Sequence, residues 1–262
     1  MANYAKLFNL AGRTALITGA GSGFGRSIAQ AFAEYGCHIA AADLDFTNAE
    51  ETSRLACKAG VRCLPLAVDV AQPESILDMV ERTRQHFGAL DILVNSAGIS
   101  QHDPAESTPL ETWDRVLDVN LRGTFLCCQA AGRLMLQQKK GVIINFSSIA
   151  GIVGMGRGAN AYCASKAGVN LLTKQLALEW AGRGIRVNAI APCQFMTPGL
   201  QEVMDDPQFD RQALMNTWIT NIPLGRVGEQ DEIVGPALFL ASDASSMVTG
   251  IVLPVDGGYL AR

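Results

Sequence analysis

The sequence predicts a doubly wound α/β fold, in which a mostly seven-stranded parallel sheet has helices on both faces. Short segments that are apolar nearly throughout alternate with longer segments whose apolar residues recur every three to four positions. Uninterrupted apolar strands are typical of parallel sheets that helices cover on both sides. A glycine-rich turn also joins the first such strand directly to the first helical segment.

Seven short segments have the composition of buried strands, because each is rich in aliphatic or β-branched residues and is bounded by turn residues. In chain order they are Thr14–Thr18, His38–Asp43, Cys63–Val68, Ile92–Asn95, Val142–Phe146, Arg186–Ile190 and Ile251–Val255. We expect these strands to pair in parallel, because helical segments alternate with them.

Three of the intervening segments show the spacing of amphipathic helices. Their apolar residues are Ile28, Phe32 and Tyr35 in the first, Ile76, Val80 and Phe87 in the second, and Val169, Leu172 and Leu176 in the third. One long interruption runs from about residue 192 to residue 223. We expect a substrate loop there, because loops of that length in compact domains are usually functional.

The composition is that of an ordinary globular protein, with 48% hydrophobic and 18% charged residues and a formal net charge of −4. We expect residues 1–262 to form one domain. The sequence has no clustered basic stripe, so nucleic acid is not an expected partner. It has neither an apolar stretch of membrane-spanning length nor an N-terminal leader pattern, which favours a cytoplasmic protein without a membrane partner.

The seven cysteines include no CxxC pair and lie in apolar segments, so we expect reduced, mostly buried thiols. They are Cys37, Cys57, Cys63, Cys127, Cys128, Cys163 and Cys193. No cluster of histidine, cysteine and acidic residues has the spacing of metal ligands, which predicts metal-free chemistry.

The glycine-rich turn, residues Thr18–Gly25, has the position of the phosphate-binding turn in Rossmann-type folds. Glycines there let backbone amides approach a pyrophosphate, and the following helix N-terminus adds partial positive charge. Asp43 ends the second strand, 20 residues after Gly23. An acid at that spacing accepts hydrogen bonds from the adenosine ribose and repels a phosphate on it. Because Leu44 and Asp45 follow, rather than Arg or Lys, the sequence predicts NAD rather than NADP.

Tyr162 and Lys166 lie one helical turn apart, so their side chains share a face. An ammonium beside a tyrosine stabilises the phenolate. Ser147 and Ser148 end a predicted strand, at the sheet edge where ligands bind in such folds. A serine hydroxyl there can donate a hydrogen bond to a carbonyl oxygen that gains charge during a reaction.

With the glycine turn, Asp43, Ser148, Tyr162 and Lys166 in this order, the chain resembles the short-chain dehydrogenase/reductase family, in its single-domain NAD-preferring branch. The resemblance extends over about residues 10–260. It implies an oxidoreductase that interconverts a secondary alcohol and a ketone by hydride transfer, with NAD as cofactor.

The resemblance also implies four catalytic residues. Tyr162 takes the alcohol proton as a phenolate, while Lys166 lowers the pKa of Tyr162 and contacts the nicotinamide ribose. Ser148 orients the alcohol or ketone, and Asn120 holds a water that links Lys166 to solvent. Two other interpretations stay open: Asn120 could cap a helix break, and Ser147 could be the donor to the substrate.

For the cofactor, the resemblance implies contacts from the glycine turn, from several strand ends and from the segment after the sixth strand. These residues are Gly19, Ser22, Gly23, Phe24, Gly25, Asp43, Leu44, Asp69, Val70, Asn95, Ala97, Gly98, Tyr162, Lys166, Pro192, Phe195 and Thr197. Two positions depart from the family pattern, because Ser96 replaces an Asn and Cys193 replaces a Gly. A Cβ restricts left-handed backbone geometry, which puts the turn at Cys193 in doubt.

We expect the substrate to lie between Ser148, the glycine-rich residues 151–158 and the 192–223 segment. Polar contacts are expected from Ser148, Asn160, Gln194 and His102, which favour a sugar, a polyol or a sugar acid. Apolar side chains offer a less polar alternative; these are Phe195, Met196, Met204 and Trp218.

Two other functions stay open. A 3-oxoacyl-(acyl-carrier-protein) reductase would look similar throughout, but those enzymes commonly use NADPH, against which Asp43 argues. The second is a non-catalytic nucleotide-binding protein. The resemblance further implies a homotetramer, and the helical segments 113–136 and 164–178 are candidates for its larger interface.

Overall fold

A seven-stranded parallel sheet forms the centre of the molecule, in the strand order β3-β2-β1-β4-β5-β6-β9. The computed structural model describes residues 4–156, 158–205, 207 and 210–261. The strands are β1 Thr14–Thr18, β2 His38–Asp43, β3 Cys63–Ala67, β4 Ile92–Asn95, β5 Gly141–Phe146, β6 Ile185–Pro192 and β9 Val252–Val255. The predicted doubly wound sheet is therefore confirmed, with β6 longer at both ends than the sequence suggested.

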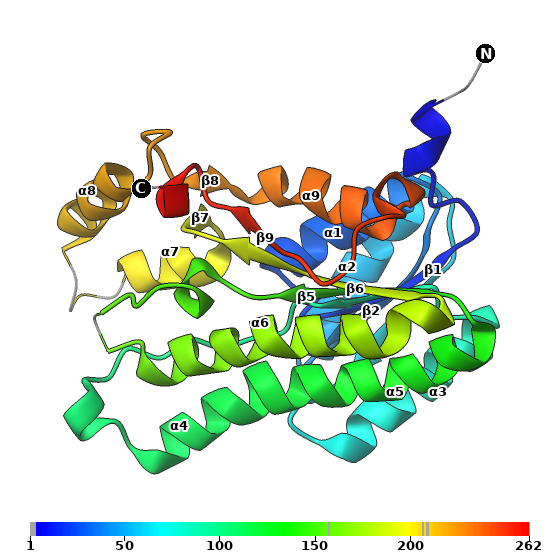
Figure 1. The fold of residues 1–262 in the computed structure, drawn as a ribbon, viewed down its shortest axis with the longest axis horizontal. Coiled ribbons are helices and arrows are strands. Elements are labelled where there is room, and N and C mark those ends of the chain that lie inside the picture. Colours follow the sequence, from blue (N-terminus) through cyan, green and yellow to red (C-terminus); the bar gives the residue numbers. More distant parts are fainter. Residues whose placement is uncertain (1–3, 157, 206, 208–209, 262) are drawn as a thin grey trace.

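Helices cover both faces of this sheet (Figure 1). One face carries α1 Gly23–Glu34, α2 Phe46–Ala56 and α9 Val234–Ala241, and the other carries α3 Pro73–Phe87, α5 Thr124–Gln138 and α6 Asn160–Trp180. The short helix α4 Leu110–Leu117 leads into α5 through a π-helical turn, Asp118–Gly123. Because both faces are covered, all five residues of β1 and all six of β5 are buried, which explains their apolar sequences.

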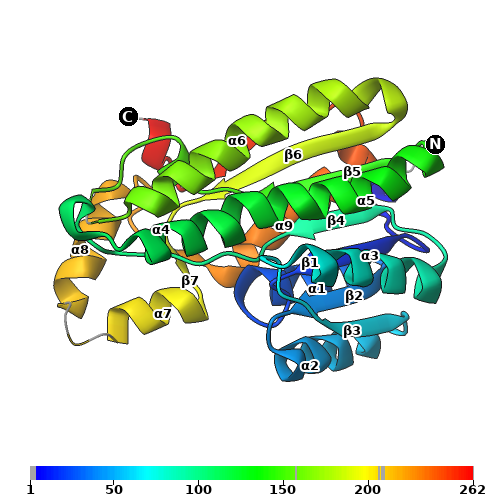
Figure 2. The same cartoon turned by 90° about the horizontal axis from the view of Figure 1, so that it is seen from below.

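The segment after β6 is largely helical, whereas the sequence predicted a loop. It contains β7 Phe195–Met196, α7 Pro198–Asp205 and α8 Arg211–Asn221, and β7 pairs with β8 Gly228–Glu229. Figures 1 and 2 show α7 and α8 beyond the carboxyl ends of the strands, where they stand over the edge of the sheet. The segment is thus placed to cover whatever binds at that edge.

The expectation of mostly buried thiols is wrong for the majority of the cysteines. All seven are free, but Cys37, Cys127 and Cys128 alone are buried. Cys57 is exposed, and the remaining three are half-buried. Cys57 and Cys63 are less buried because Cys57 directly follows α2 and Cys63 begins β3, at the amino-terminal edge of the sheet, where helices cover the strands less fully.

Candidate active site

The glycine turn is packed against the loop after β4, at the place where the strand order reverses. Gly19 has a φ of 63°, and a Cβ there would lie 2.8 Å from the backbone of Ala97. A Cβ on Gly25 would collide with the carbonyl of Gly19. Both glycines are therefore required by close backbone approach, and they leave the turn's amides open to a ligand.

A cavity of about 520 Å³ lies beside this turn. Eleven of the predicted cofactor contacts line it: Gly19, Ser22, Gly23, Phe24, Asp43, Leu44, Asp69, Val70, Ala97, Gly98 and Thr197. The Ser22 hydroxyl precedes α1 without capping it, so it too can face a ligand. A groove with bare amides, a helix N-terminus and flanking carboxylates has the donors and acceptors that suit a dinucleotide.

Asp43 is held firmly at the end of β2. Its Oδ2 accepts a hydrogen bond of 2.8 Å from the Gly21 amide, and its Oδ1 accepts one of 3.0 Å from the Asp45 amide. A Cβ on Gly21 would lie 2.7 Å from the Asp43 carboxylate, so the glycine is needed for this contact. The carboxylate is thereby fixed in the wall of the cavity.

Six predicted cofactor contacts do not line this cavity. Four of them line the second cavity described below, namely Tyr162, Lys166, Pro192 and Phe195. The other two are Gly25 and Asn95. Gly25 instead packs under the turn, as described above. Asn95 is buried, and its Nδ2 donates to Asn145 Oδ1 over 2.9 Å, while Asn145 Nδ2 donates to Thr173 Oγ1 over 2.9 Å. Asn95 therefore ties β4 to β5 and α6 beneath the site.

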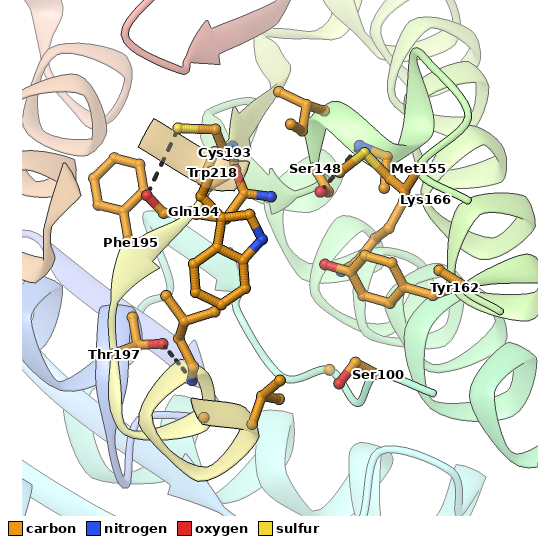
Figure 3. A pocket seen from close by; sticks show the side chains of 18 of the residues that line it. Ser100, Ser148, Met155, Tyr162, Lys166, Cys193, Gln194, Phe195, Thr197 and Trp218 are labelled. Carbon is orange, nitrogen blue, oxygen red and sulfur yellow. Dashed lines mark hydrogen bonds between the residues drawn. The ribbon is translucent and has the colours of Figure 1, made fainter. Parts of the chain in front are cut away.

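A second cavity, also of about 520 Å³, adjoins the first and holds Ser148, Tyr162 and Lys166. Figure 3 shows these three side chains on one wall, with Cys193, Gln194 and Trp218 on the facing wall. The hydroxyls of Ser148 and Tyr162 point into the space between the walls. Strand β5 and the first turns of α6 bring these groups together, as the sequence predicted for the carboxyl edge.

Lys166 is anchored beside Tyr162. Its Nζ donates a hydrogen bond of 2.8 Å to the Phe146 carbonyl and lies 5.6 Å from the centre of the Tyr162 ring. Burial lowers the pKa of Lys166 to about 8, because the charged form is poorly solvated there. The lysine thus stands near the tyrosine with a proton that it holds less tightly than usual.

Burial raises the pKa of Tyr162, and a hydrogen bond with Ser148 lowers it by less. Among the protein's own groups, desolvation is therefore the largest influence on this phenol. The expected lowering of the Tyr162 pKa by Lys166 stays a prediction.

Asn120 lies in the π-helical turn between α4 and α5 and is fully buried. Its Oδ1 accepts from the Ile99 amide over 2.9 Å, and its Nδ2 donates to the Ile99 carbonyl over 2.9 Å. A Cβ on Gly98 would lie 3.2 Å from Asn120 Oδ1 and 3.4 Å from Lys166 Nζ. Asn120 thus locks the loop after β4 and flanks the same glycine as Lys166.

Predicted substrate contacts divide into two groups. Ser148, His102 and Gln194 line the second cavity, and the Gln194 Oε1 is buried without a hydrogen-bond partner in the described part of the chain. Asn160 does not line it. Its Nδ2 donates to the Asp103 carbonyl over 3.1 Å and to Thr108 Oγ1 over 2.9 Å, so this amide fastens the 99–108 loop to α6.

The structure also places the residues predicted to contact the cofactor after the sixth strand. Pro192, Phe195 and Thr197 line the second cavity, as do Tyr162 and Lys166. In the described residues Lys139 is the one non-glycine with positive φ, so Cys193 needs no left-handed backbone and the turn tolerates its Cβ. The prediction for residues 151–158 falls partly outside the described residues, at position 157.

Two lining residues outside the expected segments were missed by the sequence analysis, namely Ser100 and Tyr259. Met155 and Thr217, which also line the second cavity, lie within the expected 151–158 and 192–223 segments. Tyr259 belongs to the C-terminal 3-10 turn Tyr259–Ala261, more than 90 residues after Lys166. No local pattern marks such residues, because only the tertiary fold brings them to the cavity.

The described residues include no group of three or more His, Cys, Asp or Glu side chains that could hold a metal ion. Among the helices within the described ranges, none is long and apolar enough to cross a bilayer.

Comparison with known proteins identifies relatives along nearly the whole chain. A family model described as Enoyl-(Acyl carrier protein) reductase matches residues 19–260. The D-threitol dehydrogenase of Mycolicibacterium smegmatis is 44% identical over 258 residues, covering 97% of this chain and 95% of that protein. The 3-oxoacyl-[acyl-carrier-protein] reductase of Thermotoga maritima is 40% identical over 251 residues, covering 96% and 99%.

Solved structures agree with these relatives. A structure described as a short-chain alcohol dehydrogenase from Sinorhizobium meliloti has a TM-score of 0.92 at 41% identity and covers 98% of this chain and 99% of its own. NAD⁺-bound xylitol dehydrogenase has a TM-score of 0.90 at 33% identity, covering 95% and 99%. A gluconate 5-dehydrogenase structure from Beutenbergia cavernae holds NADP, with a TM-score of 0.89 at 40% identity and coverage of 98% and 100%.

These likenesses cover both cavities and the groups that line them. The two relatives are named as a dehydrogenase and a reductase, and two of the three similar structures are described with a bound nicotinamide dinucleotide. The chain is accordingly an oxidoreductase acting on CH–OH groups, and it belongs to the short-chain dehydrogenase/reductase family.

Proposed function

We propose that the chain uses NAD to interconvert a secondary alcohol and a ketone in a sugar, a polyol or a sugar acid. This proposal rests on one observation: Ser148, Tyr162 and Lys166 meet in the second cavity, which adjoins the first cavity beside the glycine turn. In that arrangement a bound alcohol can reach a proton acceptor and a hydride acceptor at the same time.

When bound, NAD would supply the carbon that accepts hydride and a positively charged ring. Tyr162, as a phenolate, accepts the alcohol proton at its oxygen. Ser148 Oγ donates a hydrogen bond to the substrate oxygen, which holds the alcohol and stabilises charge on it. Lys166, anchored on the Phe146 carbonyl, keeps an ammonium close to the phenol. Asn120 keeps the loop after β4 in place, next to Lys166.

The choice of NAD rests on Asp43. Its carboxylate is fixed in the cavity wall by the Gly21 and Asp45 amides, so it cannot swing away from a ribose phosphate. The nearby Arg26 is occupied, because its Nε donates to Thr52 Oγ1 over 2.9 Å and its other nitrogen contacts the Gly21 carbonyl. A phosphate on the adenosine ribose would therefore meet a negative charge without a free arginine at the turn.

The polar wall of the second cavity supports a hydroxylated substrate. Gln194 and Trp218 face Ser148 and Tyr162 across it, and His102 and Ser100 add further polar atoms (Figure 3). The unpartnered Gln194 amide oxygen gains a partner if a substrate hydroxyl reorders this side chain. The names of relatives that act on threitol and xylitol fit the same substrate class.

A screen of polyols, sugars and sugar acids with NAD⁺ and NADP⁺ tests this proposal. We expect NADH absorbance to rise with at least one polyol and to rise more slowly with NADP⁺. Turnover restricted to acyl-thioester ketones with NADPH would instead support the carrier-protein reductase alternative. Absence of any turnover, despite nucleotide binding, would support the non-catalytic alternative.

The remaining assignments are proposals at the level of the whole molecule. We propose one catalytic domain over residues 1–262, with the 192–223 segment covering the substrate, in a cytoplasmic homotetramer without nucleic-acid or membrane partners. Exposed apolar side chains on α5 and α6 support assembly, since Phe125, Leu171 and Leu178 are 40%, 69% and 81% exposed.

A further inference from the structure

The first cavity, beside the glycine turn, is lined by more negatively charged than positively charged side chains. Of the described residues that line it, three carry formal charge, namely Asp43, Asp69 and Arg115. Two carboxylates and one guanidinium give the lining a net negative charge. The pyrophosphate of a dinucleotide adds two more negative charges, while the turn amides and the α1 N-terminus supply only partial positive charge.

Arg115 is the lining group that can offset this charge. It lies in α4 one turn before Val119, which also lines the cavity, so both face it. Its side chain is exposed and makes no hydrogen bond or ion pair within the described ranges, whereas Arg122 pairs with Asp118 and Arg26 is held by Thr52. Arg115 is thus a cation without a protein partner in a cavity that must receive an anion.

The opposite wall of the cavity comes from the segment after β6. Thr197 and Gly199 line it there, at the start of α7. Figure 2 shows α4 and α7 on either side of the edge where the strands end. Arg115 therefore lines the same cavity as the glycine turn, but from a different element.

We propose that the Arg115 guanidinium binds the pyrophosphate of the dinucleotide and closes over it from α4. This inference rests on the proposed use of a nicotinamide dinucleotide. Arginine suits the role because its planar donors match phosphate oxygens in pairs. A phosphate on the adenosine ribose is the other anion that a dinucleotide could offer, but Asp43 stands at that end of the groove, so we assign the pyrophosphate.

The test is the dissociation constant of NADH, NADPH and ADP-ribose, measured by fluorescence or calorimetry for the wild type and for Arg115→Gln. We expect Arg115→Gln to weaken NADH and ADP-ribose alike, by about tenfold for one lost charge-assisted contact. The dependence of NADH affinity on salt should become shallower. Arg115→Lys should restore part of the affinity. Arg82→Gln, which removes an exposed charge from α3 outside the cavity, should bind like the wild type.

Three outcomes would overturn the assignment. Equal NADH affinity of Arg115→Gln and wild type would show that Arg115 makes no such contact. A loss confined to NADPH would place Arg115 at the ribose phosphate. Equal thermal unfolding of the nucleotide-free proteins is required, because a lower melting temperature for the variant would indicate a structural role. A wild type that binds NADH but oxidises no alcohol contradicts the proposed function and leaves this inference standing.

Discussion

At the residue scale, the chemistry depends on a phenol that its surroundings make a weaker acid. Burial raises the pKa of Tyr162, and Ser148 offsets this only partly. Removing the hydroxyl by Tyr162→Phe should lower kcat for alcohol oxidation by about 10³-fold, the size of a lost acid–base contribution. The dissociation constant of NADH, measured by fluorescence titration, should remain within twofold of wild type. Near-normal turnover would show that another group moves the proton.

The pH profile follows from the same phenol. Alcohol oxidation requires the phenolate, so its rate should fall as pH falls through the pKa of Tyr162, whereas ketone reduction requires the phenol and should fall as pH rises. Because Lys166 supplies nearby positive charge below its own pKa of about 8, Lys166→Met should move the limb of the oxidation profile to higher pH. An unmoved limb in the log(kcat/KM) plot would mean that Lys166 does not tune the phenol.

Asp43 offers a test of cofactor choice that keeps the local structure. Asp43→Asn retains an oxygen that can accept from an amide but removes the charge that repels a ribose phosphate. We expect the ratio of kcat/KM for NAD⁺ to that for NADP⁺ to fall by about tenfold, equivalent to about 1.4 kcal/mol. The two cofactors are compared at one alcohol concentration. An unchanged ratio would assign the preference to other residues.

Local sequence spacing predicted much of the candidate site, whereas the remaining residues are brought to it by tertiary contacts that spacing does not reveal. Tyr162 and Lys166 could be paired because helical geometry fixes residues four apart, and Ser148 because strand ends share an edge. Asn160 was misplaced for the opposite reason. Its partners Asp103 and Thr108 lie more than 50 positions earlier, so its structural hydrogen bonds have no trace in local sequence.

At the element scale, α8 is a helix that the spacing of apolar residues in the sequence does not predict. The seven central strands could be predicted because burial on both faces leaves apolar runs. In α8 the apolar residues are spread around the helix and Leu214 is its one buried side chain, so no stripe marks it. The helix depends instead on its ends, where Asp210 accepts a hydrogen bond of 3.0 Å from the Ala213 amide.

Removing the Asp210 cap should weaken binding of the alcohol and leave binding of the cofactor unchanged. Asp210→Ala removes about 1 kcal/mol of helix stabilisation, while Asp210→Ser keeps a capping hydroxyl. Because Leu214, Thr217 and Trp218 of α8 line the second cavity, we expect the alanine variant to raise KM for the alcohol several-fold and to leave KM for NAD⁺ unchanged. The serine variant should behave like wild type. Equal increases in both KM values would contradict a local role for α8.

At the scale of the whole molecule, the exposed apolar side chains of α5 and α6 predict assembly. Light scattering after size exclusion should give four times the chain mass of 27.9 kDa. Leu178, which is 81% exposed on α6, is the side chain to change, because Leu178→Glu places a charge in a buried contact. We expect that variant to elute at lower mass. A measured mass equal to that of one chain for the wild-type protein would contradict the proposed tetramer.

The two cavities share part of their walls. Phe24, Ser96, Gly98, Ile99, Thr197 and Gly199 line both. A dinucleotide in the first cavity therefore becomes part of the surface that an alcohol meets in the second. We therefore expect the dinucleotide to bind before the alcohol and to leave after the ketone, because the alcohol-binding surface is complete only with the dinucleotide in place.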